Sequence, residues 1–467
     1  MSARFLGWRS RRRSMSLKPL LVTSFFGCVA IYAVISGLYW KHATVQEQNR
    51  PHLEHAETQE AWFKSLQDAQ AGLPVSSALA HPMNLAVLVQ RPPGVLGQFG
   101  YSREDLYPSA GTINGFSNEA LIFRRYELEA PTALMHGRLD LTFVVVVLLP
   151  LVLCVLNYDH IARDRERGSL RVLLVQGVRP ITLLWSRVFY CSLPSLIVLL
   201  LASIVGTLAA GKLNWETCLS LVWWCSGIAL YWMLWVTLCA LIAACSRNSL
   251  SAALSSVTVW IGLVVVLPAL LQFTVSNIAA SPSKVQLMAV ARAAEADALG
   301  TLDQREEAFI AQHATELPQS VENFSDYYRR AYLSNASVNE RVGTLLDQYQ
   351  DELSADLRLL NAIQFVSPST AAFRMLQAIS GSGFERAETF QNQARRFFRE
   401  YFQEIGVATL QQRRLTLAEA RSIADFSFRE PLAIATLSSS VAGMCVFVLV
   451  FTLVTNLTAL RMEGTPD

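Results

Sequence analysis

Six long apolar runs are the feature that most constrains the fold of this chain. They cover residues 19–40, 141–158, 188–210, 219–244, 250–275 and 432–455. A helix of about 20 apolar residues crosses the ~30 Å hydrocarbon core of a bilayer, so each run is near or above the length of a span. A soluble protein with six buried helices fits poorly with 52% hydrophobic and only 16% charged residues. We therefore predict a mainly α-helical, polytopic membrane protein with six transmembrane helices.

The arginines and lysines lie on alternate sides of these runs. Residues 1–18 are basic and amphipathic, residues 159–187 carry six arginines, Arg247 separates the fourth and fifth runs, and Arg461 lies in the tail 456–467. Lys and Arg collect in short cytoplasmic loops. With an even number of spans, we predict that both termini are cytoplasmic. The first run is longer than the apolar core of a secretory signal, so we interpret it as an uncleaved anchor.

Two long segments, residues 41–140 and 276–431, are then predicted to lie outside the cytoplasm. The first contains a stretch punctuated by Pro and Gly at residues 90–107, which indicates irregular structure with a few helices or short strands. In the second, Val338, Val342 and Leu346 recur at helical spacing, and Ser367-Pro368 is typical of a capped helix start. We predict a compact helical domain there.

The sequence offers no convincing catalytic or metal-binding motif. The eight cysteines lie in or beside the apolar runs, and the cluster His42, His52 and His55 lacks a further ligand at suitable spacing. Residues 206–212 match the Gly-x4-Gly-Lys core of a phosphate-binding loop, but Leu213 stands where Ser or Thr would hold magnesium, and an apolar run precedes it. We therefore predict no catalytic residue, no metal site and no cofactor in this chain.

The central parts of the six runs contain no Asp, Glu, Lys or Arg. Ion-coupled carriers and proton relays need such groups in mid-membrane, so this absence argues against a secondary transporter and predicts an energy source elsewhere. The fourth run carries an aromatic group, and two interpretations of it stay open: packing with interface anchoring, or a face that contacts a substrate. Its members are Trp223, Trp224, Tyr231, Trp232 and Trp235.

The connection between the second and third runs, residues 159–187, is densely charged. It places apolar residues at helical spacing beside the charges, as in a helix that binds a groove on a soluble partner. The alternative is a solvated charge cluster that only sets membrane topology. The candidate partner-binding residues are Arg163, Asp164, Arg165, Glu166, Gly168, Leu170, Arg171, Leu173 and Leu174.

This connection and the layout around it resemble the permease subunits of type-2 ABC transporters. In that family a Glu followed by Gly-Thr-Leu and a Leu-Leu pair forms a coupling helix that docks on the ATPase subunit. Here Glu166, Gly168, Ser169 and Leu170 match, with Ser169 in place of the commoner Thr, and Leu173-Leu174 supplies the pair. The large segment before the last run is similar to a bacterial subfamily with a helical extracytoplasmic insertion at that position.

The resemblance implies a permease subunit of an exporter in the bacterial inner membrane. It implies two copies of a separate ATPase subunit, which would hold ATP and magnesium, and either a homodimer or a sister permease. The outer domain would gate the exit or receive a periplasmic partner, and no nucleic-acid partner is expected. Two alternatives stay open: an ABC machine that transmits force without passing a substrate, and a membrane-anchored sensor or scaffold without an ATPase.

Overall fold

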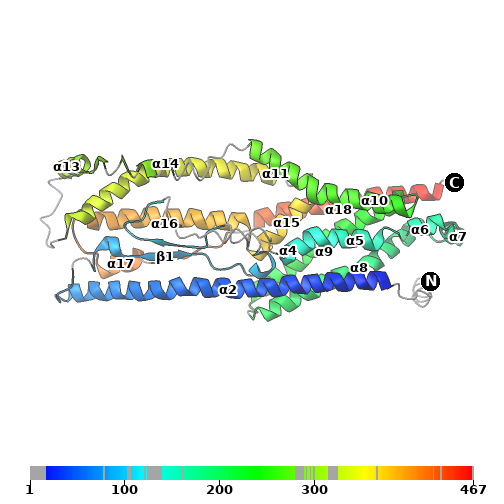
Figure 1. Cartoon of the computed structure of the whole chain (residues 1–467), viewed down its shortest axis with the longest axis horizontal. Helices are drawn as coiled ribbons and strands as arrows, with labels where there is room; N and C mark the ends of the chain where they lie inside the picture. The colour runs from blue at the N-terminus through cyan, green and yellow to red at the C-terminus, as the bar shows by residue number, and fades with distance from the viewer. Residues whose placement is uncertain are drawn as a thin grey trace.

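The molecule is long and almost entirely helical, with a membrane-length bundle at one end and a second helical region at the other (Figure 1). The computed structural model describes residues 17–76, 79–101, 107–119, 122–123, 139–159, 161–211, 213–278, 289–290, 292–294, 296–297, 300–313, 324–363, 366–423, 425–431 and 434–464. Both described chain ends lie at the free end of the bundle. We call the region at the opposite end the distal domain.

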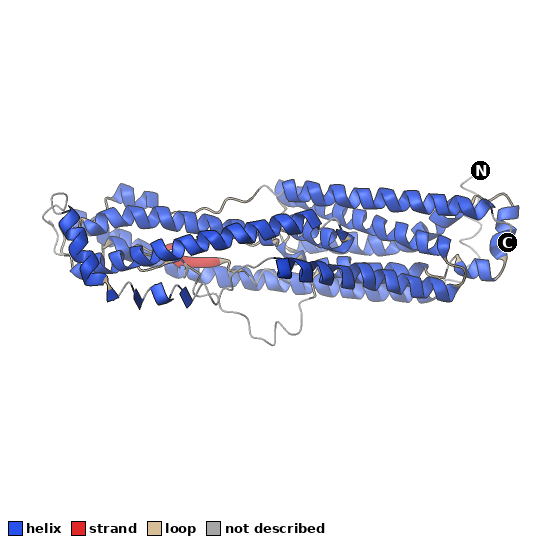
Figure 2. Cartoon of the chain, turned by 90° about the horizontal axis from the view of Figure 1, so that it is seen from above, coloured by secondary structure: helices blue, strands red, loops and turns tan. Residues whose placement is uncertain are grey.

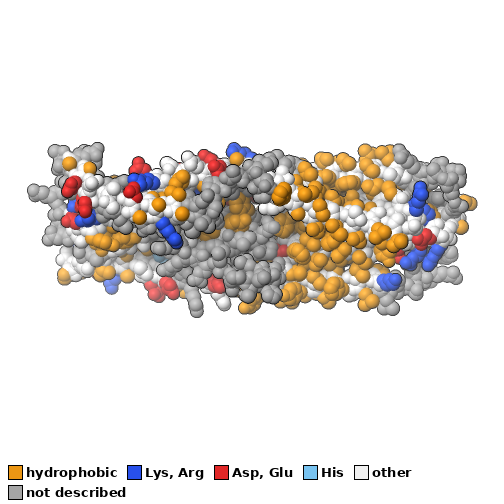
Figure 3. Space-filling model, turned by 45° about the horizontal axis from the view of Figure 1, so that its top comes forward, with side chains coloured by type: hydrophobic (Ala, Val, Ile, Leu, Met, Phe, Trp, Pro, Cys, Tyr) orange, Lys and Arg blue, Asp and Glu red, His pale blue; other side chains and the backbone are white. Residues whose placement is uncertain are grey.

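Six helices in the described residues are long and apolar enough to cross a membrane. A broad belt of hydrophobic side chains covers this half of the molecule, whereas charged side chains are seen on the other half and at the free end of the bundle (Figure 3). The chain is therefore a multi-pass membrane protein. The helical segments of the bundle are the first part of α2 (Leu17–Gln70), α4 (Leu141–Phe143) with η5 (Val144–Leu148) and α5 (Leu149–Asn157), α8 (Pro180–Ala209), α9 (Trp215–Cys245), α10 (Ser249–Trp260) with η6 (Ile261–Val266) and α11 (Leu267–Ile278), and α18 (Ile434–Gly464).

Helix α9 is the centre of the bundle. It packs against α5, α8, α10 and α18, and its Trp224, Tyr231 and Trp235 side chains are fully buried. The aromatic group of the fourth apolar run thus packs mostly inside the protein, and of its members only Trp223, at 46%, is exposed. Large aromatic side chains at the centre supply the contact area that holds the surrounding helices together.

Helix α2 continues far beyond the predicted first span at residues 19–40. After Trp40 the sequence is rich in Glu, Gln and Ala, which favour helix, and the helix ends only at Gln70. Its outer part is held in place because Trp62 and Leu66 are buried in the core of the distal domain. At about 1.5 Å per residue, its 54 residues span about 80 Å.

Within the described residues, the distal domain combines this outer part of α2 with a small hairpin and four further helices. Strands β1 (Val87–Gln90) and β2 (Ala110–Ile113) pair antiparallel, with Val87 opposite Ile113 (Figure 2). Two short 3-10 turns, η1 (Pro82–Asn84) and η2 (Gly97–Phe99), flank β1. The helices are α13 (Leu302–His313), α14 (Asp326–Ile363), α16 (Phe384–Leu410) and α17 (Leu417–Ile423).

Helix α15 (Pro368–Ser380) begins at the predicted position, with the Ser367 hydroxyl capping the backbone N–H of Thr370 at 3.2 Å. It lies within the segment that is predicted to form a compact helical domain, but it does not pack only against that segment. Instead Ala371, Ala372 and Leu376 join the core of the membrane bundle. The small side chains at 371 and 372 allow the close approach, and Gly381 ends the helix with a φ of 77°.

The loop around η2 also enters the end of the bundle. Phe99 is fully buried and stacks on Trp224 with a centroid distance of 5.1 Å, and the Thr142 hydroxyl donates to the Phe99 carbonyl at 2.9 Å. This loop lies directly on α15, because a Cβ added to Gly94 would be 2.8 Å from the backbone of Gly381. The two elements together close the distal end of the bundle.

Candidate functional site

The charged connection after the second span forms two short helices at the free end of the bundle (Figure 1). Helix α6 covers Ala162–Glu166 and α7 covers Ser169–Val175. They are separated at Gly168, whose φ of 70° suits glycine, and Gly177 has a similar φ of 79° after α7. The connection is therefore two short helices in place of the single docking helix that was predicted. Gly168 lies at the turn between them, and Gly177 lies at the turn that follows α7.

Asp164 and Arg165, two of the predicted site residues, contact neighbouring membrane helices. Asp164 forms an ion pair with Arg187 on α8. The guanidinium of Arg165 donates to the carbonyls of Ser246 and Ala244, the latter at 3.2 Å, where α9 ends. Carbonyls at a helix C-terminus have no partner within the helix and carry partial negative charge, so a guanidinium there is favourable.

Glu166 contacts the N-terminus of α10. Its carboxylate accepts hydrogen bonds from the backbone N–H of Ser249 at 2.7 Å and from the Ser249 hydroxyl at 2.9 Å. Asn248 and Ser251 form a capping box at the same helix start. A carboxylate is favourable here because the first N–H groups of a helix lack partners and carry partial positive charge.

Asp164, Arg165 and Glu166 thus bind three different membrane helices, α8, α9 and α10, from three consecutive positions. These residues are predicted from the sequence to bind a partner protein, and in the structure their charged groups contact helices of the same chain. Arg163 pairs with Asp159 one turn earlier, and its side chain is 45% exposed. A displacement of α6 would therefore act on three spans at once.

Two described leucines of α7 face inward. Leu170 and Leu173 pack with Leu183, at the start of α8, in a small buried cluster. The exposed apolar side chains on the described part of α7 are Val172, at 58%, and Val175, at 89%. The side chains of Arg171 and Leu174 lie outside the described residues, so their predicted roles are not placed.

A buried polar contact behind α6 was not identified from the sequence. The Asn157 amide donates to the Ser192 hydroxyl at 2.9 Å, and the Ser192 carbonyl accepts from the Trp232 indole at 3.2 Å. These residues join α5, α8 and α9 just inside the bundle. The only local signal was Asn157 at the end of an apolar run, which does not reveal its partners.

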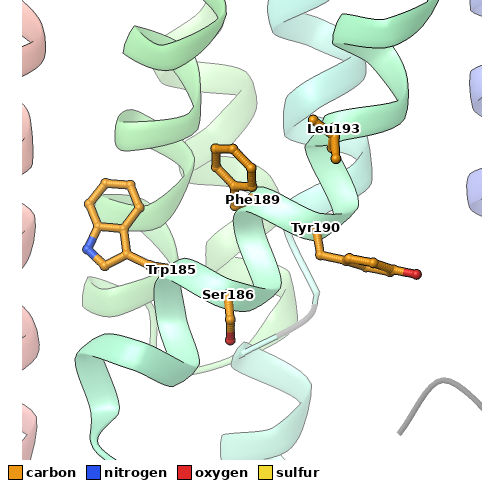
Figure 4. Close-up of a pocket in the computed structure, with 5 residues that line it drawn as sticks. All are labelled: Trp185, Ser186, Phe189, Tyr190 and Leu193. Carbon is orange, nitrogen blue, oxygen red and sulfur yellow. The ribbon is translucent and has the colours of Figure 1, made fainter. Parts of the chain in front are cut away.

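A shallow hollow lies on α8 close to this site (Figure 4). Its lining is mostly aromatic and apolar, and the Trp185 indole donates to Asn456 on α18 at 2.9 Å. It lacks the converging polar groups that orient a small ligand, so it does not form a convincing binding site. The lining residues are Trp185, Ser186, Phe189, Tyr190 and Leu193.

The histidine cluster and the phosphate-loop-like stretch form parts of the fold. Within the described ranges no group of three His, Cys, Asp or Glu residues could hold a metal ion, and His55 Nε2 instead accepts the backbone N–H of Leu88 at 3.0 Å. The phosphate-loop-like stretch begins at Gly206 inside α8 and turns at Gly211. Lys212 lies outside the described residues.

Comparison with known proteins gives one match. A family model described as Domain of unknown function (DUF3526) matches residues 284–429, which include α13 to α17. No curated protein and no solved structure matches this chain. The match delimits the region before the last span, and it carries no activity.

Proposed function

We propose that this chain is the membrane-spanning permease subunit of a type-2 ABC exporter, coupled through α6 and α7 to separate ATPase subunits. The observation that carries the proposal is the attachment of Asp164, Arg165 and Glu166 to α8, α9 and α10. A docking element must transmit motion to the spans, and these three contacts provide a direct path. The sequence resemblance around Glu166 and Gly168 supports the same assignment.

The proposed complex contains two ATPase subunits and two permeases, either two copies of this chain or one copy with a sister permease, in the bacterial inner membrane. ATP and magnesium belong to the ATPase subunits. The ATPase surface would contact α7 through Val172 and Val175, because these apolar side chains are exposed beside the charged α6. Arg163, with its half-exposed side chain, would add charge complementarity.

The test is mild-detergent purification of the tagged chain, with co-purifying subunits identified by mass spectrometry and assayed for ATP hydrolysis. We expect the wild type to retain an ATPase subunit, and the double variant Val172→Glu/Val175→Glu to lose it. Val407→Glu is the matched control, because Val407 is 53% exposed on α16 in the distal domain. Recovery of the wild type without an ATPase, across several detergents, would contradict the proposal.

One observation favours the second candidate function, force transmission without passage of a substrate. Helix α2 continues from the free end of the bundle into the distal domain (Figure 1), which gives a tilt of the first span a direct path to the distal domain. Insertion of Gly-Gly-Ser after Gln46 would uncouple the two parts of α2. If force transmission is the function, activity of the complex is lost while its ATPase subunit stays bound. An exporter would tolerate the insertion.

A further inference from the structure

The second membrane helix is interrupted by a π-helical turn, η5. The backbone N–H of Leu149 donates to the carbonyl of Val144, five residues earlier, instead of four. Two carbonyls of this widened turn receive side-chain donors from neighbouring helices. The Tyr231 hydroxyl of α9 donates to Val146 O at 2.9 Å, and the Trp260 indole of α10 donates to Val147 O at 3.1 Å. Turns of this kind are frequent at functional sites.

The same tyrosine lies against the region that matches DUF3526. Its hydroxyl is 3.4 Å from the Ser369 hydroxyl in the first turn of α15, and both side chains are buried. One turn earlier on α9, a Cβ added to Gly227 would be 3.0 Å from the methyl carbon of Met375. Tyr231 and Gly227 therefore share the α9 face on which α15 rests.

A second π-helical turn, η6, follows Trp260 directly, and the Leu267 N–H donates to Gly262 O across it. Helix α15 packs against both η5 and η6. The two π-helical turns of the described bundle thus meet the helix that closes its distal end. Because bilayer-buried backbone groups must be satisfied inside the protein, Tyr231 and Trp260 help fix where the turn in the second span lies.

The α6 end is connected to this point through α10. Glu166 holds the first residue of α10, Ser249, and Trp260 at the last residue of α10 holds the π-helical turn. Between them, the Cys154 thiol contacts the Ser256 carbonyl at 3.8 Å. A shift of α10 relative to the second span must therefore be absorbed at η5.

We propose that η5 is a two-state relay that couples α6 to α15, with Tyr231 and Trp260 as its positioning residues. The DUF3526-matched region then acts as a cap on the distal end of the bundle, and α6 controls this cap from the opposite end. Loss of one residue from the widened turn rotates the helix beyond it by about 100° and shifts it by about 1.5 Å. That motion would move Thr142, whose hydroxyl holds the Phe99 loop against α15. The relay deepens the proposed function, and it rests on that function for its driving force.

The experiment is hydrogen exchange, followed by mass spectrometry, of the full chain in lipid nanodiscs without any ATPase. Loss of one hydrogen bond changes an opening equilibrium about tenfold, so Tyr231→Phe is expected to raise exchange about tenfold in residues 144–149 and also in α15. Trp260→Phe should act on the same two peptides, with less than additive effect in the double variant. Tyr190→Phe is the matched control, since Tyr190 is 68% exposed on α8.

The variant Glu166→Ala, at the α6 end of the bundle, distinguishes a relay from a purely structural role of Tyr231. If Tyr231 were only structural, a change at Glu166 would not alter hydrogen exchange in α15. We expect Glu166→Ala to raise exchange in α15 as well as at the start of α10, and to add nothing there when Tyr231 is already Phe. The relay is overturned if Tyr231→Phe leaves α15 unchanged, or if the effect of Glu166→Ala stops at α10. This exchange experiment contains no ATPase, so its outcome does not depend on whether the chain binds one. If the co-purification test found no ATPase subunit, the proposed function would be contradicted, but the coupling between α6 and α15 could still be measured.

Discussion

We predict that the attachment of α14 to the η1 turn depends on pH through His81. The ring is 1% exposed, stacks on Tyr328 at 3.7 Å, and accepts the Met83 N–H on Nδ1 at 3.1 Å. The Phe324 ring packs edge-to-face with it at a centroid distance of 4.7 Å, and the Arg414 guanidinium carbon lies 5.9 Å from the centroid of the Phe324 ring. Burial lowers the pKa of His81 from 6.5 to about 4, so the folded protein holds the neutral ring.

The sign of the effect follows from proton binding. Between pH 6.5 and 4 the unfolded chain binds a proton at His81 that the folded chain does not, so the free energy of unfolding falls as pH falls. The loss at pH 5 relative to pH 8 is about 2 kcal/mol. We expect residues 80–87 to lose about 30-fold in hydrogen-exchange protection, after correction for intrinsic rates.

The assay compares the full chain in nanodiscs at pH 5 and pH 8 with two variants. His81→Gln cannot titrate and should show no such drop, whereas His52→Gln, which removes an exposed histidine on α2, should keep it. Equal protection of residues 80–87 at both pH values in the wild type would refute the reasoning. An equal drop in His81→Gln would also refute it, because the titrating group would then lie elsewhere.

Three further predictions concern the docking element and the cap. Glu166→Lys and Gly168→Pro should leave the chain in the membrane but abolish ATPase association and transport. The first variant loses the contacts with Ser249, and proline in the second cannot adopt a φ of 70°. Normal transport by both variants would contradict the coupling role. Gly94→Ala should destabilise the cap by about 1–3 kcal/mol, because the new methyl group would clash with the backbone of α15. The measurement is the melting temperature, which should fall. Gly262→Ala is the control and should not lower it, because a methyl group there meets no atom within 4 Å. Replacement of residues 281–430 by a Gly/Ser linker should lower membrane levels of the protein on immunoblots, because it removes Ala371, Ala372 and Leu376 from the bundle core; wild-type levels would show that the bundle stands alone.

Local chemistry made part of the fold predictable. The six spans follow from apolar runs that the bilayer requires, and the start of α15 follows from the Ser367 cap and Pro368. The length of α2 did not follow, because the end of an apolar run marks where a helix leaves the hydrocarbon and not where it ends. Trp62 and Leu66 decide that outcome through contacts with the distal core.

At the candidate site, too, the sequence shows which residues are charged or apolar but not which residues they contact. The charges of Asp164, Arg165 and Glu166 were visible in the sequence, but their partners Arg187, Ser246 and Ser249 lie 23 to 83 residues away. A leucine stripe at helical spacing fits either a partner protein or the rest of the chain, and for Leu170 and Leu173 the chain supplies Leu183.

The π-helical turn left no local trace. The run Val144–Leu148 reads as ordinary apolar helix, and its widened turn is linked to the distant donors Tyr231 and Trp260.

The most direct test of the central claim is site-specific photo-cross-linking at Val175, the most exposed apolar side chain on the described part of α7. A photoreactive amino acid at this position, activated in intact cells, should give an adduct whose partner is identified by mass spectrometry as an ATP-hydrolysing subunit. The same probe at Val407 should give no such adduct. Absence of an ATPase adduct at Val175, or an equal yield at Val407, would contradict the account.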